Sequence, residues 1–157
     1  MTNRAATRVS ACIATLCCVF IGPVASASAS SESIRAALVS YLGKIDTAES
    51  HVQTALNEYK VSNDPAGVQQ ALSGAIAVMN GMEFKVERQA AVAPRVKEAK
   101  TKVEKGLQKV IVGYEELAIA YGERAANPQA AVTTATRAVK LVKQGGAELR
   151  EGVNLLG

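Results

Sequence analysis

The chemistry available to this chain rests on very few residues. The sequence contains one histidine, His51, and three cysteines at positions 12, 17 and 18. A single histidine excludes a histidine-based metal cluster within one chain. The sequence also lacks a Gly-x-Ser-x-Gly motif, whose serine nucleophile the histidine could activate as a base. The carboxylates form no Glu-x-x-His pair, which excludes a di-iron centre of the ferritin kind. The sequence therefore predicts a protein that is not an enzyme and has no catalytic or metal-binding residues.

A histidine and a methionine on neighbouring helices are the one pair that suggests a cofactor. Folding the chain about residue 63 places His51 opposite residue 75, one turn from Met79. Exported four-helix bundles can bind haem through such a pair, but no Cys-x-x-Cys-His attachment motif is present. Methionines at this spacing usually fill a core. We therefore predict no cofactor, and His51 and Met79 are the ligands that a haem-binding alternative would use.

Basic residues are concentrated between Lys85 and Lys109, a segment that contains eight lysines and arginines but only three glutamates. The candidates for an interaction face are Lys97, Lys100, Lys102, Lys105 and Lys109. Such a face would meet an anionic membrane surface, an acidic polysaccharide or an acidic protein. The alternative is a solvated helix face with glutamate pairs. The segment contains no aromatic residue for stacking on bases, so nucleic acid is not an expected partner.

The first 27 residues have the features of a leader sequence. Two arginines precede an apolar run at 9–24, and alternating alanines and serines follow it. This order predicts a cleaved secretory signal peptide over residues 1–27, with cleavage after Ala27 or, alternatively, Ala29. The expected location is therefore secreted or periplasmic.

Cleavage would remove every cysteine and half of the net charge. All three cysteines belong to the predicted leader, so the exported protein would have no disulfide and no thiolate ligand. The whole chain has 157 residues and a formal net charge of +4. Removing the two leader arginines leaves 16 basic against 14 acidic residues, or about +2. We expect a short flexible amino terminus at 28–32 and a single domain at 33–157.

Apolar residues beyond residue 33 recur every three or four positions, which predicts helices and no strands. Four segments carry this pattern, near 33–61, 65–92, 94–125 and 128–156. Alternating steps of four and three are typical of the seam of a left-handed bundle. The favoured fold is all-α, an up-down-up-down four-helix bundle with heptad-like seams.

Prolines mark the starts of the last three helices. Asp64-Pro65 and Asn127-Pro128 each combine an N-cap residue with proline at the first helical position. Pro94 has no capping residue before it, and some helices continue through a proline with a kink. The alternative fold therefore has one long kinked central helix, with the two outer helices folded back on it.

Small residues repeat every seven positions beside the seam of the last two helices. This small-residue stripe consists of Ala99, Gly106, Gly113 and Ala120 in the third helix and Ala131, Ala138, Gly145 and Gly152 in the fourth. Glycine inside a helix costs about 1 kcal/mol relative to alanine, so its repetition needs a physical reason. We favour close packing of these two helices. The alternatives are a groove that receives another helix or an apolar ligand, and helices weakened so that the bundle opens.

The second helix carries its own glycine series, Gly67, Gly74 and Gly81, on another face. Together these features predict an exported structural or protein-interaction module that works in the envelope or outside the cell. Another protein or a second copy is the expected partner, through the lysines or the small-residue stripe. A carrier of an apolar ligand or haem between helices is the alternative.

Overall fold

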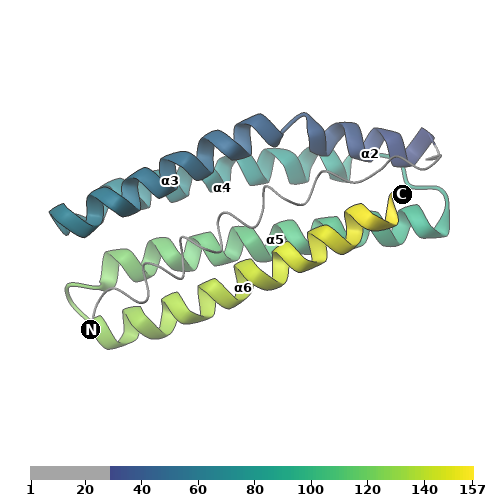
Figure 1. Cartoon of the computed structure of the whole chain (residues 1–157). Helices are drawn as coiled ribbons and strands as arrows, with labels where there is room; N and C mark the ends of the chain where they lie inside the picture. Colours follow the sequence, from purple (N-terminus) through teal and green to yellow (C-terminus); the bar gives the residue numbers. More distant parts are fainter. Residues whose placement is uncertain (1–28) are drawn as a thin grey trace.

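The computed structural model of the protein describes residues 29–157, which form five α-helices. They are α2 at Ala29–Val39, α3 at Leu42–Ser62, α4 at Ala66–Glu87, α5 at Pro94–Glu123 and α6 at Pro128–Leu155. α2 and α3 follow each other along one edge of the molecule and form the first arm of a four-helix bundle (Figure 1). The predicted all-α four-helix bundle is confirmed, and the described part of the chain contains no strand.

Capping residues were predicted at two of the turns; the prediction is right for α6, whereas α4 begins one residue later than predicted, at Ala66 with Pro65 as its N-cap. Asn127 is the N-cap of α6, and its side-chain oxygen accepts a hydrogen bond from the N–H of Ala130 at 3.2 Å. At the first turn, the Asp64 carboxylate accepts one from the N–H of Ala66 at 3.0 Å. Asn63 ends α3 in the left-handed conformation with a φ of 57°. Short polar side chains that satisfy helix-end amides therefore define both turns.

Pro94 starts a new helix, so the four-armed bundle is right and the kinked central rod is wrong. Ala93 is extended, with φ −67° and ψ 142°, because the proline ring disfavours a helical residue before it. α4 ends at Glu87 and not near residue 92 as predicted. The Lys100 ammonium group donates hydrogen bonds to the carbonyl oxygens of Glu87 and Gln89, at 2.5 and 2.8 Å. These bonds from α5 stabilise the earlier end of α4.

The first arm begins earlier than predicted. Residues 29–32, predicted to be flexible, form the first turn of α2. Ile34 is fully buried there, and the Ser33 hydroxyl donates a hydrogen bond to the carbonyl oxygen of Ser30 at 3.0 Å. Burial of this isoleucine anchors the turn. The predicted signal peptide, residues 1–27, lies outside the described residues.

The first arm is also interrupted at Ser40 and Tyr41, where the periodicity predicts a single helix. Tyr41 lies against α4 at Gly81, where an ideal Cβ would stand 2.9 Å from the Tyr41 hydroxyl oxygen. The ammonium groups of Lys44 and Lys85 lie 4.7 and 5.2 Å from the centre of the Tyr41 ring, within cation–π range. The break thus coincides with a contact between two helices, which local periodicity does not reveal.

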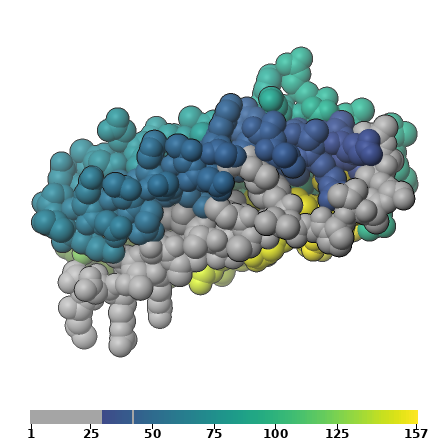
Figure 2. Space-filling view, turned by 45° about the horizontal axis from the view of Figure 1, so that its top comes forward, coloured from purple at the N-terminus to yellow at the C-terminus, as the bar shows by residue number. Residues whose placement is uncertain are grey.

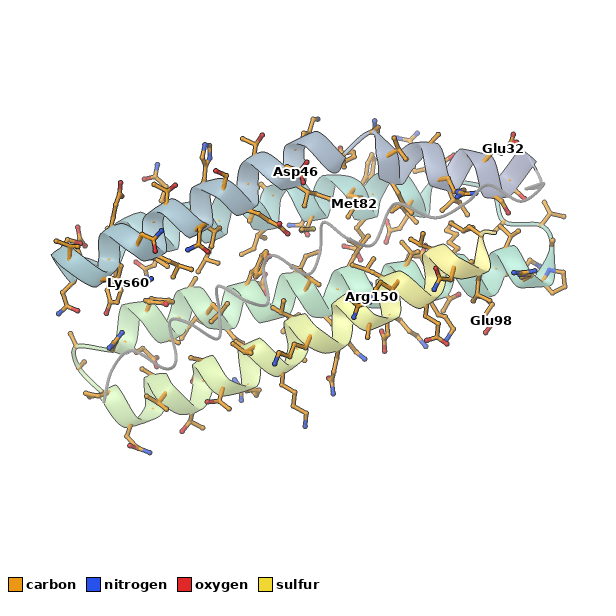
Figure 3. All side chains as sticks on the ribbon, viewed as in Figure 1. Glu32, Asp46, Lys60, Met82, Glu98 and Arg150 are labelled. Atoms are coloured by element: carbon orange, nitrogen blue, oxygen red, sulfur yellow. The ribbon has the colours of Figure 1, made fainter. Side chains whose placement is uncertain are left out.

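The apolar core lies between the α3–α4 pair and the α5–α6 pair (Figure 1). Met82, labelled on α4 in Figure 3, is fully buried in this core. α5 and α6 share the most extensive interface, whereas α3 packs mainly on α4. None of the described helices has the length and apolar character needed to cross a membrane.

Candidate functional site

The small-residue stripe lies at the interface of α5 and α6, and all eight of its members are buried. An ideal Cβ on Gly106 would lie 2.8 Å from the carbonyl oxygen of Gly145. One on Gly145 would lie 2.5 Å from the carbonyl oxygen of Gly106. The two backbones therefore touch, and not even a methyl group fits between them.

The stripe residues face one another in a single antiparallel register. An ideal Cβ on Gly113 would meet the carbonyl oxygen of Ala138 at 3.0 Å, and one on Gly152 would meet that of Ala99 at 2.9 Å. The residue numbers of every facing pair have the same sum, which places the remaining two alanines of the stripe opposite each other. The stripe therefore joins two helices of this chain and is not open to a partner.

Two of the five candidate lysines pair with α6. Lys102 lies 2.8 Å from a carboxylate oxygen of Glu151, and Lys109 lies 2.5 Å from one of Glu148. The hydrogen bond to Glu151 is the main reason that the pKa of Lys102 is raised above its usual value. These lysines flank the close contact between α5 and α6, so their charge is largely balanced within the chain.

The other three candidates do not complete a basic face. Lys100 is directed to the end of α4 and also lies 3.7 Å from Glu104. Lys97 and Lys105 are exposed and form no ion pair with another described residue. At 100° per residue, Lys100 and Lys102 point to opposite sides of α5. The sequence suggested one interaction face, but in the structure Lys100, Lys102 and Lys109 have different neighbours within the chain.

His51 and Met79 do not belong to one site. His51 is exposed and lines a surface groove between α3 and α4, whereas Met79 is fully buried and does not line it. Ala75, near which the predicted register placed His51, lines the same groove. Haem ligation needs both side chains at one iron atom, and this arrangement does not provide that. Within residues 29–157, no group of three or more His, Cys, Asp or Glu side chains is placed to hold a metal ion.

The groove between α3 and α4 has a volume of about 770 Å³ and is open to solvent. The lining of this α3–α4 groove consists of Gly43, Lys44, Thr47, Ala48, His51, Thr54, Ala55 and Glu58 from α3 and Gly67, Gln70, Ala71, Gly74, Ala75 and Val78 from α4. Figure 2 shows α3 beside α4 along this edge of the molecule. Most lining side chains are small, and none is Phe, Tyr or Trp.

Glycines on both walls leave the groove wide. Gly43, Gly67 and Gly74 have no atom within 4 Å of an ideal Cβ, in contrast to the glycines between α5 and α6. Gly81, the third member of the α4 series, is covered by Tyr41. Alanine would stabilise the helix at the open positions, and no contact within the described residues requires glycine there.

Three polar side chains repeat every seven residues along the α3 wall. Lys44, His51 and Glu58 are all exposed and line the groove. Successive members are about 10 Å apart along the helix, too far for a nucleophile and a base to act on one atom. Lys44 and Glu58 form no ion pair with a described residue. Sequence reasoning missed both, although their spacing from His51 was a visible signal.

Comparison with protein-family models, with curated proteins and with solved structures finds no match for this chain. Its class is therefore defined by its own geometry, as an all-α four-helix bundle with an open groove between α3 and α4. The interpretation of that groove rests on its lining residues.

Proposed function

We propose that the protein is an exported, non-enzymatic interaction module that binds another protein through the α3–α4 groove. The observation that supports this proposal is the contrast between two glycine series. Gly106 and Gly145 allow a backbone contact within the chain, whereas Gly67 and Gly74 face open space. The open glycines lower helix stability without an internal contact in return. A helix of a partner protein would use them for close packing, as α6 uses those of α5.

The shape and lining of the groove favour a protein surface over a small molecule. Pockets for small ligands enclose most of the ligand and are lined mainly by apolar and aromatic side chains. This groove is open, contains no Phe, Tyr or Trp side chain and has exposed polar residues along α3. The separation of His51 from Lys44 and Glu58 supports a role without catalysis. The predicted leader at 1–27 supports export.

Site-specific photo-cross-linking tests the proposal in the producing cell. A photoreactive residue is placed at Thr54, which is exposed and lines the groove. The matched control is Val112, which is exposed on α5 away from the groove. We expect irradiation to give a discrete protein adduct from position 54 and none from position 112.

A second variant connects the adduct to the shape of the groove. Gly74→Leu fills open space, so the chain should fold normally while the adduct at position 54 is lost. Equal labelling at both positions, or no adduct at either, would overturn the proposal. A haem absorption band or a retained lipid that disappears in Gly74→Leu would replace it with the carrier function.

A further inference from the structure

We propose that the occupant of the α3–α4 groove is a second copy of this chain, with the two α3 helices packed antiparallel. The inference rests on the proposed function, because it names the partner of the same groove. It is carried by the order of charges on α3, which is complementary to itself.

Among the exposed groove residues of α3, the ionisable ones form a symmetric series: Lys44, His51 and Glu58. Lys44 and Glu58 lie seven residues to either side of His51. A two-fold axis at His51 therefore places Lys44 of each copy against Glu58 of the other. Such an interface is self-complementary, since residue i contacts residue j and residue j contacts residue i. A parallel arrangement would instead place like charges together at both ends.

The charges at both ends of this series are available for a partner. Lys44 and Glu58 are exposed and have no ion pair within residues 29–157, unlike Lys102 and Lys109 on α5. The Lys44 ammonium group lies 4.7 Å from the centre of the Tyr41 ring, which holds it at the end of the groove. Because this long side chain is already restricted before association, it loses less conformational entropy when the dimer forms.

The groove also provides room for close approach. Gly67 and Gly74 have no atom within 4 Å of an ideal Cβ, so at these two positions the α4 wall presents backbone and not side chains. Contact between Gly106 and Gly145 shows that this chain already joins antiparallel helices at positions without side chains. Two copies can therefore bring their α3–α4 faces together while the charges fix the register.

Charge reversal with rescue tests this dimer. Sedimentation equilibrium of the exported protein should show a concentration-dependent dimer. Lys44→Glu and Glu58→Lys should each weaken it by at least about tenfold, because each places like charges at both ends. An equimolar mixture of the two variants should restore association, since every end then pairs opposite charges. Lys60→Glu is the control, as Lys60 is exposed on α3 but does not line the groove.

The results separate this inference from the proposed function. Circular dichroism should show that all three exposed variants fold like the wild type. A monomer at every concentration, or a mixture that associates no better than each variant alone, would overturn self-association. If the Thr54 adduct then contains a different protein, the proposed function stands and the second copy is wrong. An adduct with the mass of two chains that is lost in Lys44→Glu supports both.

Discussion

Gly145 and Gly146 are neighbours in α6, yet a methyl group has opposite consequences at the two positions. At Gly145 an ideal Cβ would lie 2.5 Å from the carbonyl oxygen of Gly106, and backbone cannot move aside as a flexible side chain can. An ideal Cβ on Gly146 would have no neighbouring atom within 4 Å. The seven-residue repeat in the sequence places Gly145 in the small-residue stripe and leaves Gly146 out, but it does not show that Gly146 faces open space.

The two glycines give the first prediction. Gly145→Ala should lower the free energy of unfolding by about 1–3 kcal/mol, since α5 and α6 must separate. Gly146→Ala should raise it by up to about 1 kcal/mol, because alanine favours the helix. Urea unfolding followed by circular dichroism measures both. Equal effects of the two substitutions would contradict the close contact between α5 and α6.

Tyr121 gives a prediction for the dependence of stability on pH. Burial raises the pKa of its phenol above the usual value, although Arg124 opposes the shift. Above about pH 10 the unfolded chain loses this proton before the folded chain does, so folding becomes less favourable as the pH rises. We expect Tyr121→Phe to lose less stability than the wild type above pH 10, measured by urea unfolding. A greater alkaline loss in the variant would contradict this assignment.

At the scale of single residues, prediction from the sequence succeeded where the relevant pattern lies along one helix. The seven-residue repeat of Gly106 and Gly113 favoured close packing of the last two helices over its alternatives, and these glycines do meet the backbone of α6. The role of Lys100 in stabilising the end of α4 could not be predicted from the sequence, because its hydrogen bonds join α5 to carbonyl oxygens at and just beyond that end. Lys44 and Glu58 were overlooked because single charges on a helix usually face solvent, and only the groove gives them a common position.

At the scale of helices, the start of α6 depends on one side chain. The Asn127 side chain accepts the hydrogen bond from Ala130 that the first helical turn would otherwise lack. Asn127→Ala should therefore lower the free energy of unfolding by about 1 kcal/mol. Gln129→Ala, two residues further on and exposed, should change it by less than about 0.5 kcal/mol. Urea unfolding of the pair tests this, and equal effects would mean that the cap does not stabilise the helix.

The helices should also differ in local stability. α5 and α6 share the most extensive interface, whereas α3 packs mainly on α4 and borders the open groove. Fewer contacts lower the free energy of local opening. We expect amide hydrogen exchange to be slowest in the middle of α5 and α6 and faster in α2 and α3. Slowest exchange in α3 would contradict this order.

The helices themselves follow from periodicity, but their ends do so only in part. Asn127 combines a capping side chain with a following proline, and it begins α6 as predicted. Pro94 could end or kink a helix by local rules alone. Tertiary contacts are absent from such rules. The first arm is likewise divided at Tyr41, where the ring packs against Gly81 of α4.

At the scale of the whole molecule, the two ends of the described chain meet. The Arg35 guanidinium donates a hydrogen bond to the carbonyl oxygen of Gly157 at 3.1 Å, which joins α2 to the carboxyl terminus. The α3–α4 and α5–α6 pairs enclose the core between them (Figure 1). This arrangement leaves the α3–α4 groove on the outside. The groove was not predictable, because it depends on what neighbouring helices leave uncovered.

Association through that outer face should depend on salt. The proposed dimer joins Lys44 to Glu58 at both ends, and both side chains are exposed. Raising sodium chloride from about 0.05 to 1 M should therefore weaken the dimer severalfold. Sedimentation equilibrium at the two concentrations measures the change. A dimer strengthened by salt would indicate apolar association and would contradict the charge register.

The shared seven-residue spacing on α5 and α6 has a consequence for how the hairpin can assemble. Sliding α6 by one turn would put the bulky Leu149 in the place of Gly145, where the backbones of the two helices already touch. The next position at which small residues meet lies a full repeat away, about 10 Å along the helix. There one small residue at the end of the stripe in each helix would lose its counterpart. The α5–α6 hairpin can therefore assemble only in registers that differ by a full seven-residue repeat, because every intermediate register produces a steric clash.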